Sequence, residues 1–212
     1  MRVADGVGVA ALEGWVREFA RAVAEHREEL TELDSAIGDA DHGTNMDRGM
    51  SAAVAALDAT PPVDPAALLK TVAMTMISKV GGTSGPLYGT FFLRMSGAFG
   101  DGSPGAFEAA FRAGVEGVIA RGKAEPGDKT MLDALLPAAD ALTTAVSGGE
   151  PLDAALRAAA DAAAGGRDAV TPLVARKGRA SYLGERSADH VDPGAASAVL
   201  LVETAAGTLA ER

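Results

Sequence analysis

Apolar residues recur every three or four positions along most of the chain, the spacing of one face of an amphipathic helix. In the first such stretch, residues 9–28, the stripe consists of Leu12, Val16, Phe19 and Val23. Further stripes predict helices at about 44–57, 65–80, 87–99, 103–121, 130–146, 151–164 and 195–209, with a short helical piece up to about 174. No stretch alternates between apolar and polar residues, so strands are not expected.

Proline and glycine residues mark the expected helix boundaries. Asp64 and Pro65 have the residue types preferred at the N-cap and at the first position of a helix. Pro137 predicts a bend or a new start in the helix at 130–146, because proline lacks the N–H that a helix interior needs. Gly165 and Gly166 predict the end of the helix that begins near Pro151.

The number of stripes predicts the fold class. The chain has 212 residues, of which 48% are hydrophobic but only 4% aromatic, so the core must consist mainly of Ala, Val, Leu and Met. These residues favour helices, alanine most of all. We predict an all-α bundle of about eight helices that forms a single domain over residues 1–212.

The charge and composition exclude several classes of function. A net charge of −10 argues against a nucleic-acid partner, which normally requires a basic face. The absence of cysteine excludes disulfides, thiolate catalysis and zinc–thiolate sites. Neither a signal-peptide pattern nor an apolar run of about 18 residues occurs, so we expect no membrane association and a cytoplasmic protein.

Residues 34–45 carry the densest group of polar residues with chemical potential. Asp34, Asp39 and Asp41 fall within eight positions and are followed by His42, a glycine, a threonine and Asn45. Carboxylates this close repel one another, and a bound hard cation such as Mg²⁺ or Ca²⁺ relieves the repulsion. The alternative is a solvated acidic loop that precedes a helix.

Two known ion- and phosphate-binding motifs do not fit the sequence. An EF-hand that began at Asp39 would need Gly at its sixth position and Glu at its twelfth, where Thr44 and Met50 stand. Residues 122–130, Gly-Lys-Ala-Glu-Pro-Gly-Asp-Lys-Thr, resemble a P-loop, but Asp128 separates the second glycine from the lysine. No strand precedes that segment either, so it is not a P-loop.

A second candidate for phosphate binding is the Gly-rich turn at residues 81–86. Thr83 and Ser84 lie between glycines just before a predicted helix, where backbone N–H groups and hydroxyls bind anions. An ordinary helix–helix turn is the alternative. The phosphate interpretation is strengthened by the acidic stretch, because proteins usually hold Mg²⁺ with a few carboxylates and the phosphates of the substrate.

The three histidines and the longest predicted loop are further candidates for a functional role. His42 could reach a phosphate or orient a metal-binding carboxylate, whereas His26 and His190 are expected at the surface. No local signature of a nucleophilic triad occurs, so no catalytic residue is assigned. The polar segment 175–194 is predicted to be a long loop, and loops longer than about 12 residues are usually functional.

Four motifs in order resemble the nucleotide-binding subunit L of dihydroxyacetone kinase, and the resemblance covers almost the whole chain. They are Asp34 with Gly-Asp-Ala-Asp-His-Gly-Thr-Asn45, Gly-Gly-Thr-Ser-Gly-Pro86, Arg-Gly-Lys-Ala-Glu-Pro-Gly-Asp-Lys-Thr-Met131, and Ala-Arg-Lys-Gly-Arg-Ala-Ser-Tyr-Leu-Gly-Glu-Arg-Ser187 with Asp-Pro-Gly194. The resemblance implies a closed up-and-down barrel of eight antiparallel amphipathic helices with the nucleotide across the loops at one end, and a lid formed by residues 175–194.

The resemblance also assigns site residues. It implies ADP or ATP as cofactor, together with two Mg²⁺ ions held by Asp34, Asp39 and Asp41. Residues that would contact the phosphates and the ribose region are His42, Gly43, Thr44, Asn45, Thr83 and Ser84. Residues that would line the rest of the nucleotide are Gly122, Met131, Arg179, Asp192, Pro193 and Gly194.

In the bacterial form of this family the kinase is divided among subunits. The resemblance implies that ADP on this chain receives a phosphoryl group from a phosphohistidine on an M subunit of the phosphotransferase system. It then passes the group to dihydroxyacetone on a separate K subunit, so the chain alone is expected to be inactive. The alternatives are a component of an ATP-dependent kinase for another ketose and an ADP-loaded module that regulates a transcription regulator; a homodimer is also compatible.

Overall fold

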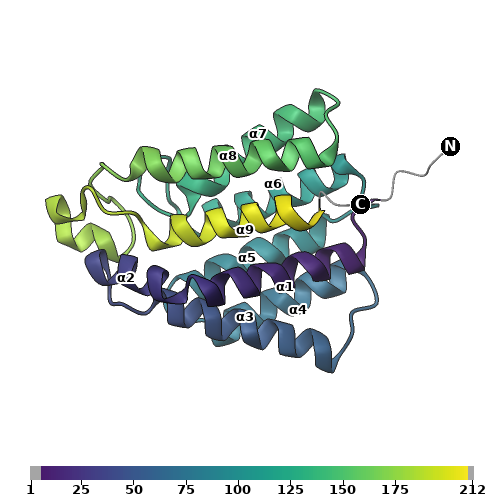
Figure 1. Cartoon of the computed structure of the whole chain (residues 1–212), viewed down its shortest axis with the longest axis horizontal. Coiled ribbons are helices and arrows are strands. Elements are labelled where there is room, and N and C mark those ends of the chain that lie inside the picture. Colours follow the sequence, from purple (N-terminus) through teal and green to yellow (C-terminus); the bar gives the residue numbers. More distant parts are fainter. Residues whose placement is uncertain (1–5, 210–212) are drawn as a thin grey trace.

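The computed structural model describes residues 6–209, and within that range it contains helices and no strands (Figure 1). The all-α fold predicted from the apolar stripes is therefore confirmed. The elements are α1 (Val9–Glu25), α2 (Arg27–Ile37), α3 (His42–Ala59), α4 (Pro65–Lys79), α5 (Ser84–Ala98), α6 (Pro104–Gly122), α7 (Leu132–Ser147), α8 (Leu152–Val170), the 3₁₀ helix η1 (Arg179–Ser187) and α9 (Pro193–Leu209).

The long helices lie side by side and enclose one main hydrophobic core (Figure 1). From α3 to α9 each helix packs against the α-helix that follows it, and α1 packs against both α3 and α9. This order of neighbours is the one that an up-and-down barrel requires, although closure as a barrel stays a prediction. Trp15 in α1 is fully buried, and its indole N–H donates to the carbonyl of Leu201 in α9 at 3.0 Å, which joins the two ends of the chain.

Alanine, valine, leucine and methionine make up most of the core, as the composition predicts. Most of the few aromatic side chains gather where α1, α5 and α6 meet. Trp15 lies 6.0 Å from Phe92 and 6.1 Å from Phe107 between ring centroids, and Phe91 stands edge-on to Phe111 at 5.3 Å. Small side chains elsewhere let the helices approach closely.

The prediction of one helix over residues 9–28 is wrong, because the chain breaks at His26. This residue ends α1, with its N–H bonded to the carbonyl of Ala22, and α2 follows immediately. Leu30, Asp34 and Ile37 are buried in α2, and its apolar stripe of Leu30, Leu33 and Ile37 is short. Asp34 therefore lies in the last turn of a helix and not in a loop.

The predicted breaks at Pro137 and at Gly165–Gly166 are also wrong, and one contact explains both. Pro137 lies inside α7, where its missing N–H leaves the carbonyl of Asp133 without a helical partner. Gly166 lies inside α8, and a Cβ on it would overlap that carbonyl oxygen. The glycine thus allows α8 to pack directly against the proline turn of α7.

Residues 175–194 are more ordered than the predicted loop. They contain η1, which is kinked at Gly184 (φ 55°), and the first two residues of α9. Helices α3 and α5 likewise begin two or three residues earlier than expected, at His42 and Ser84. In each case residues assigned to loops instead form the first turn of a helix.

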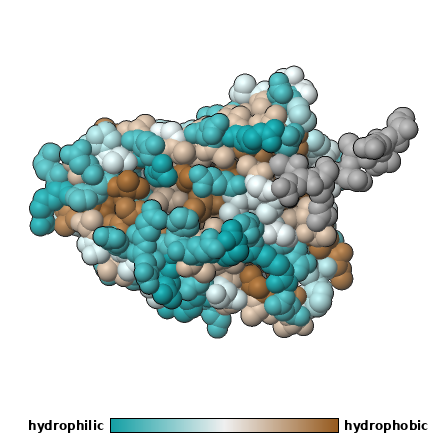
Figure 2. All heavy atoms as spheres, viewed as in Figure 1, coloured by the Kyte–Doolittle hydropathy of each residue, from teal (hydrophilic) through white to brown (hydrophobic). Residues whose placement is uncertain are grey.

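The surface of the molecule is largely hydrophilic, as expected for a chain with a net charge of −10. In the view of Figure 2 the outer faces are largely hydrophilic, and hydrophobic residues gather mainly in the middle, over α9 between α8 and α1. None of the helices within residues 6–209 has both the length and the hydropathy needed to cross a bilayer.

Candidate functional site

A cavity of about 840 Å³ opens at the end of the bundle where η1 lies. Its size is that of a typical small-molecule site. Four separate segments contribute to its wall, and these are the segments that carry the four sequence motifs. All but two of the candidate residues line it: Asp34, Asp39, Asp41, His42, Asn45, Thr83, Ser84, Gly122, Met131, Arg179, Asp192, Pro193 and Gly194.

The N-terminal ends of four helices meet at this cavity. The residues that precede or begin them line its wall: Asp41 for α3, Thr83 for α5, Met131 for α7 and Pro193 for α9. The first N–H groups of a helix have no helical partner, and the helix dipole makes this end positive. Four such ends around one cavity favour an anionic ligand.

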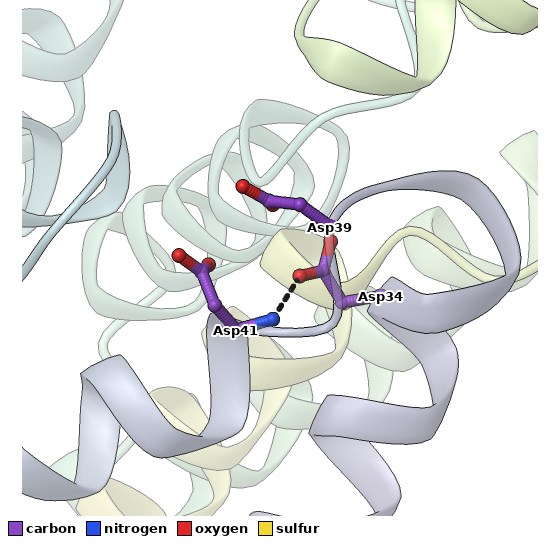
Figure 3. Close-up of side chains that lie close together, drawn as sticks. All are labelled: Asp34, Asp39 and Asp41. Atoms are coloured by element: carbon purple, nitrogen blue, oxygen red, sulfur yellow. Dashed lines mark hydrogen bonds between the residues drawn. The ribbon is translucent and has the colours of Figure 1, made fainter.

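Three carboxylates gather at one edge of the cavity, at the connection between α2 and α3 (Figure 3). One oxygen from each of Asp34, Asp39 and Asp41 lies within 4.8 Å of the other two. Asp34 is buried, whereas Asp39 and Asp41 are exposed to the cavity. An all-oxygen set of this kind fits a hard divalent cation such as Mg²⁺.

Backbone hydrogen bonds fix the orientation of Asp34. Its Oδ2 atom accepts the N–H of Asp41 at 2.8 Å (Figure 3). The same atom accepts the N–H of His42 at 3.1 Å. Gly38 lies against the same carboxylate, and a Cβ at that position would overlap it. The turn is therefore folded around the Asp34 side chain, which explains the glycine between the first and second aspartates.

Arg179 reaches from η1 to the acidic cluster and forms an ion pair with Asp39 at 2.9 Å. Both side chains are largely exposed, so the pair contributes little to stability. The ion pair matters instead for the geometry of the site, because it places a guanidinium group of the long 175–194 segment beside the carboxylates.

His42 lies in a buried chain of hydrogen bonds. Its Nε2 atom is 2.9 Å from Ser197 Oγ, and its Nδ1 atom is 3.2 Å from Ser84 Oγ. Ser197 Oγ in turn lies 2.8 Å from the hydroxyl of Tyr88, which is fully buried. Burial lowers the pKa of His42 to about 4 against the opposing charges of Asp34 and Asp41, so the imidazole is neutral at pH 7.

The turn at residues 81–84 brings Ser84 and Asn45 to the same part of the wall. Gly82 has a positive φ of 65°, which favours glycine. Gly81 packs closely on the amide of Asn45, whose oxygen accepts a hydrogen bond from Arg48 at 2.6 Å. Thr83 occupies the N-cap position of α5, and Ser84, whose hydroxyl contacts His42, lines the cavity together with it.

Gly43 and Thr44 are the two candidates that do not line the cavity. A Cβ on Gly43 would overlap the carbonyl oxygen of Arg27, so this glycine permits close packing of α3 on α2. Thr44 lines a separate shallow hollow beside Ser35. Both residues lie in the first turn of α3, where backbone N–H groups have no helical partner.

Asp192 precedes α9, and its Oδ2 atom accepts the N–H of Ala195 at 2.7 Å. Burial raises the pKa of its carboxyl group to about 7, and the neighbouring Asp133 acts in the same direction. Gly194 packs on the same carboxylate, and a Cβ at position 194 would come too close to the Oδ2 atom of Asp192.

The segment at 122–131, correctly rejected as a P-loop because no strand precedes it, is shaped by hydrogen bonds that the sequence did not reveal. Asp133 accepts the N–H groups of Gly127 at 2.5 Å and Thr130 at 2.8 Å. Asp128 pairs with Arg176 at 2.9 Å. Lys129 is fully buried, which lowers its pKa, and its ammonium group donates to three main-chain carbonyls.

Basic side chains at the cavity wall were also missed. Arg121, Arg176 and Lys177 line it together with Arg179. Three of them fall in the polar segment 175–194, and the clustering of basic residues there, in a chain with an acidic excess, was the available signal.

Comparison with known proteins places these features in a family. The pattern of the DAK2 domain matches residues 36–207. The chain is 44% identical over 192 residues to the "PEP-dependent dihydroxyacetone kinase, ADP-binding subunit DhaL" of Escherichia coli, covering 89% of this chain and 91% of that protein. It is 45% identical over 189 residues to a protein of the same description from Listeria innocua, covering 88% and 90%.

A solved structure agrees with the sequence comparison. The dihydroxyacetone kinase from C. freundii in complex with AMP-PNP and Mg²⁺ superimposes with a TM-score of 0.71 at 25% identity. The match covers 95% of this chain but only 34% of that kinase, so the chain spans about a third of its length.

Proposed function

The chain belongs to the DAK2 domain family, and we propose that it is the ADP-binding subunit of a phosphoenolpyruvate-dependent dihydroxyacetone kinase. Two relatives described in those terms match it over about nine-tenths of both lengths. The observation that carries the proposal is the cavity itself, where three clustered carboxylates face the N-terminal ends of four helices. That combination suits a ligand that is both a polyanion and a chelator of divalent cations, as a nucleoside diphosphate is.

The ligand assignment follows from the two kinds of polar group. Asp34, Asp39 and Asp41 would hold two Mg²⁺ ions, which neutralise phosphate charge and polarise the phosphoryl group that is transferred. Ser84 and the first N–H groups of α3, α5 and α9 would donate to the phosphate oxygens. Gly122, Met131 and Pro193 would line the remainder of the nucleotide.

The source and destination of the phosphoryl group lie on other chains. We infer a phosphohistidine on an M subunit as donor and dihydroxyacetone on a K subunit as acceptor. His42 is buried, neutral and engaged with two serines, which makes it unsuitable as a phosphate carrier or as the base that activates a sugar hydroxyl. The bound nucleotide would thus act as a retained cofactor of the subunit.

Reconstitution tests this assignment. The chain, loaded with ADP and Mg²⁺, is mixed with K and M subunits, the general phosphotransferase proteins and phosphoenolpyruvate, and dihydroxyacetone phosphate is measured. Product is expected only when all components are present, and none is expected from the chain with dihydroxyacetone and ATP alone. Full activity with ATP in the absence of the M subunit would replace the proposal with an ATP-dependent kinase component.

The dissociation rate of ADP separates the same two functions without partners. A retained cofactor should leave over hours, because it is rephosphorylated in place. A consumed substrate must leave within the time of one turnover, which is seconds or less for typical enzymes.

A further inference from the structure

Lys129 is a buried charged residue to which the proposed function assigns no role. Its side chain has no exposed surface, and Nζ donates to the carbonyls of Thr171 at 2.7 Å, Leu173 at 2.8 Å and Ser187 at 2.6 Å. A lysine ammonium group has three donors and no acceptor. All three donors are therefore used, and all of them bind main-chain oxygens.

The three carbonyls flank one segment, residues 174–187. Thr171 and Leu173 lie between α8 and this segment, and Ser187 is the last residue of the segment and of η1. Lys129 thus ties the residues just before the 174–187 segment to its last residue. Because main-chain carbonyls are bound, the tie depends on the path of the segment and not on its side chains.

Ser187 adds a second tie at the same place. Its side chain is buried, and Oγ accepts the N–H of Ala175 at 2.9 Å and donates to the carbonyl of Gly184 at 2.6 Å. Arg176 fixes the entry further, since its backbone N–H donates to the carbonyl of Asp128 at 3.1 Å. The base of the segment is therefore held on both sides by buried or partly buried hydrogen bonds.

The middle of the segment has few such bonds and lies over the cavity. It is bounded by Gly178 and Gly184, which have positive φ values of 70° and 55°. Between them, Arg179 reaches Asp39, and Tyr182 lines the cavity while 89% of its surface is exposed. Ala180 and Leu183 also pack on Ile37 of α2, so the position of these two side chains depends on this small apolar contact and on the base to which the segment is tied.

We propose that Lys129 and Ser187 are positioning residues that clamp the base of the 174–187 segment, hold Arg179 over the bound nucleotide and so slow its release. The proposal rests on the proposed function, since it takes the cavity to be the nucleotide site. Neither residue needs to touch the nucleotide. The charge is required because a neutral side chain of similar shape could not donate to three main-chain carbonyls, and the loss of these bonds, above all the buried one to Ser187, would favour opening of the segment.

The direct test is the dissociation rate of a fluorescent ADP analogue from the Mg²⁺-loaded protein, chased with excess ADP. Lys129→Met removes all three donors at nearly constant length. Ser187→Ala removes only the side-chain tie and leaves Lys129 with its carbonyl partners. Both variants should release the analogue faster, Lys129→Met by roughly ten- to a hundredfold and Ser187→Ala by less. Lys70→Met, at an exposed position of α4, should leave the rate unchanged.

Hydrogen exchange of the nucleotide-free proteins supplies a readout that does not depend on binding. Amides of residues 176–186 should exchange faster in both variants, while those of α4 and α5 should not change. A lower thermal midpoint with unchanged release and unchanged exchange in this segment would overturn the proposal, because the lysine would then only stabilise the bundle.

The same pair of measurements keeps the two proposals apart. If Lys129→Met does not fold, Ser187→Ala decides the question, since it retains the buried ammonium group. If the unsubstituted protein binds no ADP, the proposed function is wrong, and the proposed slowing of nucleotide release by the clamp is wrong as well. Faster exchange confined to residues 176–186 would in that case still establish the clamp, and unchanged exchange would exclude it.

Discussion

At the scale of single residues, His42 shows how a polar side chain in the wall of the site is kept neutral. It is buried between Ser84 and Ser197, and burial lowers its pKa from the usual 6.5 to about 4. The unfolded chain therefore binds a proton on this residue between pH 6.5 and pH 4, and the folded protein does not. The contribution to stability is fully present above pH 6.5 and is lost as the pH falls toward 4.

Replacing His42 with Gln should remove this pH dependence. Between pH 7.5 and pH 4 the free energy of unfolding of the unsubstituted protein should fall by about 3 kcal/mol more than that of His42→Gln. Urea unfolding at the two pH values measures the difference. His26→Gln, at an exposed histidine, should follow the unsubstituted protein, and an identical fall in all three would show that His42 titrates normally.

Asp39 tests the metal assignment at the same scale. Its carboxylate is exposed and its pair with Arg179 is largely solvated, so Asp39→Asn should leave the helical circular dichroism unchanged. The loss of one metal-binding oxygen should nevertheless abolish retention of ADP through purification. The nucleotide is measured by mass spectrometry after acid release, with Asp161→Asn on the outside of α8 as a control that should retain it. Retention by Asp39→Asn would exclude this residue as a ligand of the metal.

At the scale of secondary structure, the packing of α8 on α7 depends on one proline and one glycine. Pro137 leaves the carbonyl of Asp133 without an N–H donor, and Gly166 allows α8 to cover that carbonyl closely. The free carbonyl of one helix thus lies where the other helix has no side chain. This contact involves the main-chain carbonyl of Asp133, and the side chain of the same residue shapes the 122–131 segment of the cavity wall.

The two adjacent glycines of α8 provide a matched comparison. Gly166→Ala should destabilise the protein by about 1–3 kcal/mol, because the new methyl group overlaps the Asp133 carbonyl. Gly165→Ala meets no atom within 4 Å and should be neutral or stabilise by up to about 1 kcal/mol, since alanine favours the helix. Chemical denaturation measures both. Equal effects of the two substitutions would show that the close approach is unimportant.

Sequence patterns predicted those elements whose signals are local. α4 follows from the Asp64 and Pro65 start signal, and the Asp64 carboxylate does accept the N–H of Ala67 at 2.7 Å. α2 was missed because its apolar stripe, Leu30, Leu33 and Ile37, is short and runs into the acidic residues that were assigned to a loop. The predictions at Pro137 and Gly166 were wrong because each residue disfavours a helix locally. The contact that makes both residues acceptable joins α7 and α8, and a local sequence pattern cannot reveal it.

The candidate site could be predicted in its residue types but not in its connections. The acidic cluster and the Gly-rich turn could be recognised from their residue types. Lys129 and Ser187 did not, because their partners are main-chain carbonyls and amides more than ten positions away, and backbone groups leave no trace in a sequence. Arg121 was overlooked since an isolated basic residue is common on any surface, whereas Lys177 belongs to the basic cluster of the 175–194 segment.

At the scale of the whole molecule, the helices form a rigid support that brings distant loops to one end. α1 and α9 are joined through Trp15, and the cavity draws its wall from residues between 34 and 194. The arrangement collects the positive ends of four helices and three carboxylates around a single space, in a chain whose net charge is −10. Such a chain should bind a polyphosphate only when cations accompany it, because its net charge repels the free anion.

Calorimetric titration of ADP into the nucleotide-free protein tests this claim most directly. With Mg²⁺ present, saturable binding of one ADP per chain is expected. With EDTA in place of Mg²⁺, binding should weaken by at least roughly a hundredfold or disappear, because the carboxylates then face the phosphates without a cation between them. The absence of binding in Mg²⁺, or equal affinity with and without the metal, would contradict the assignment of this cavity as a nucleotide–metal site.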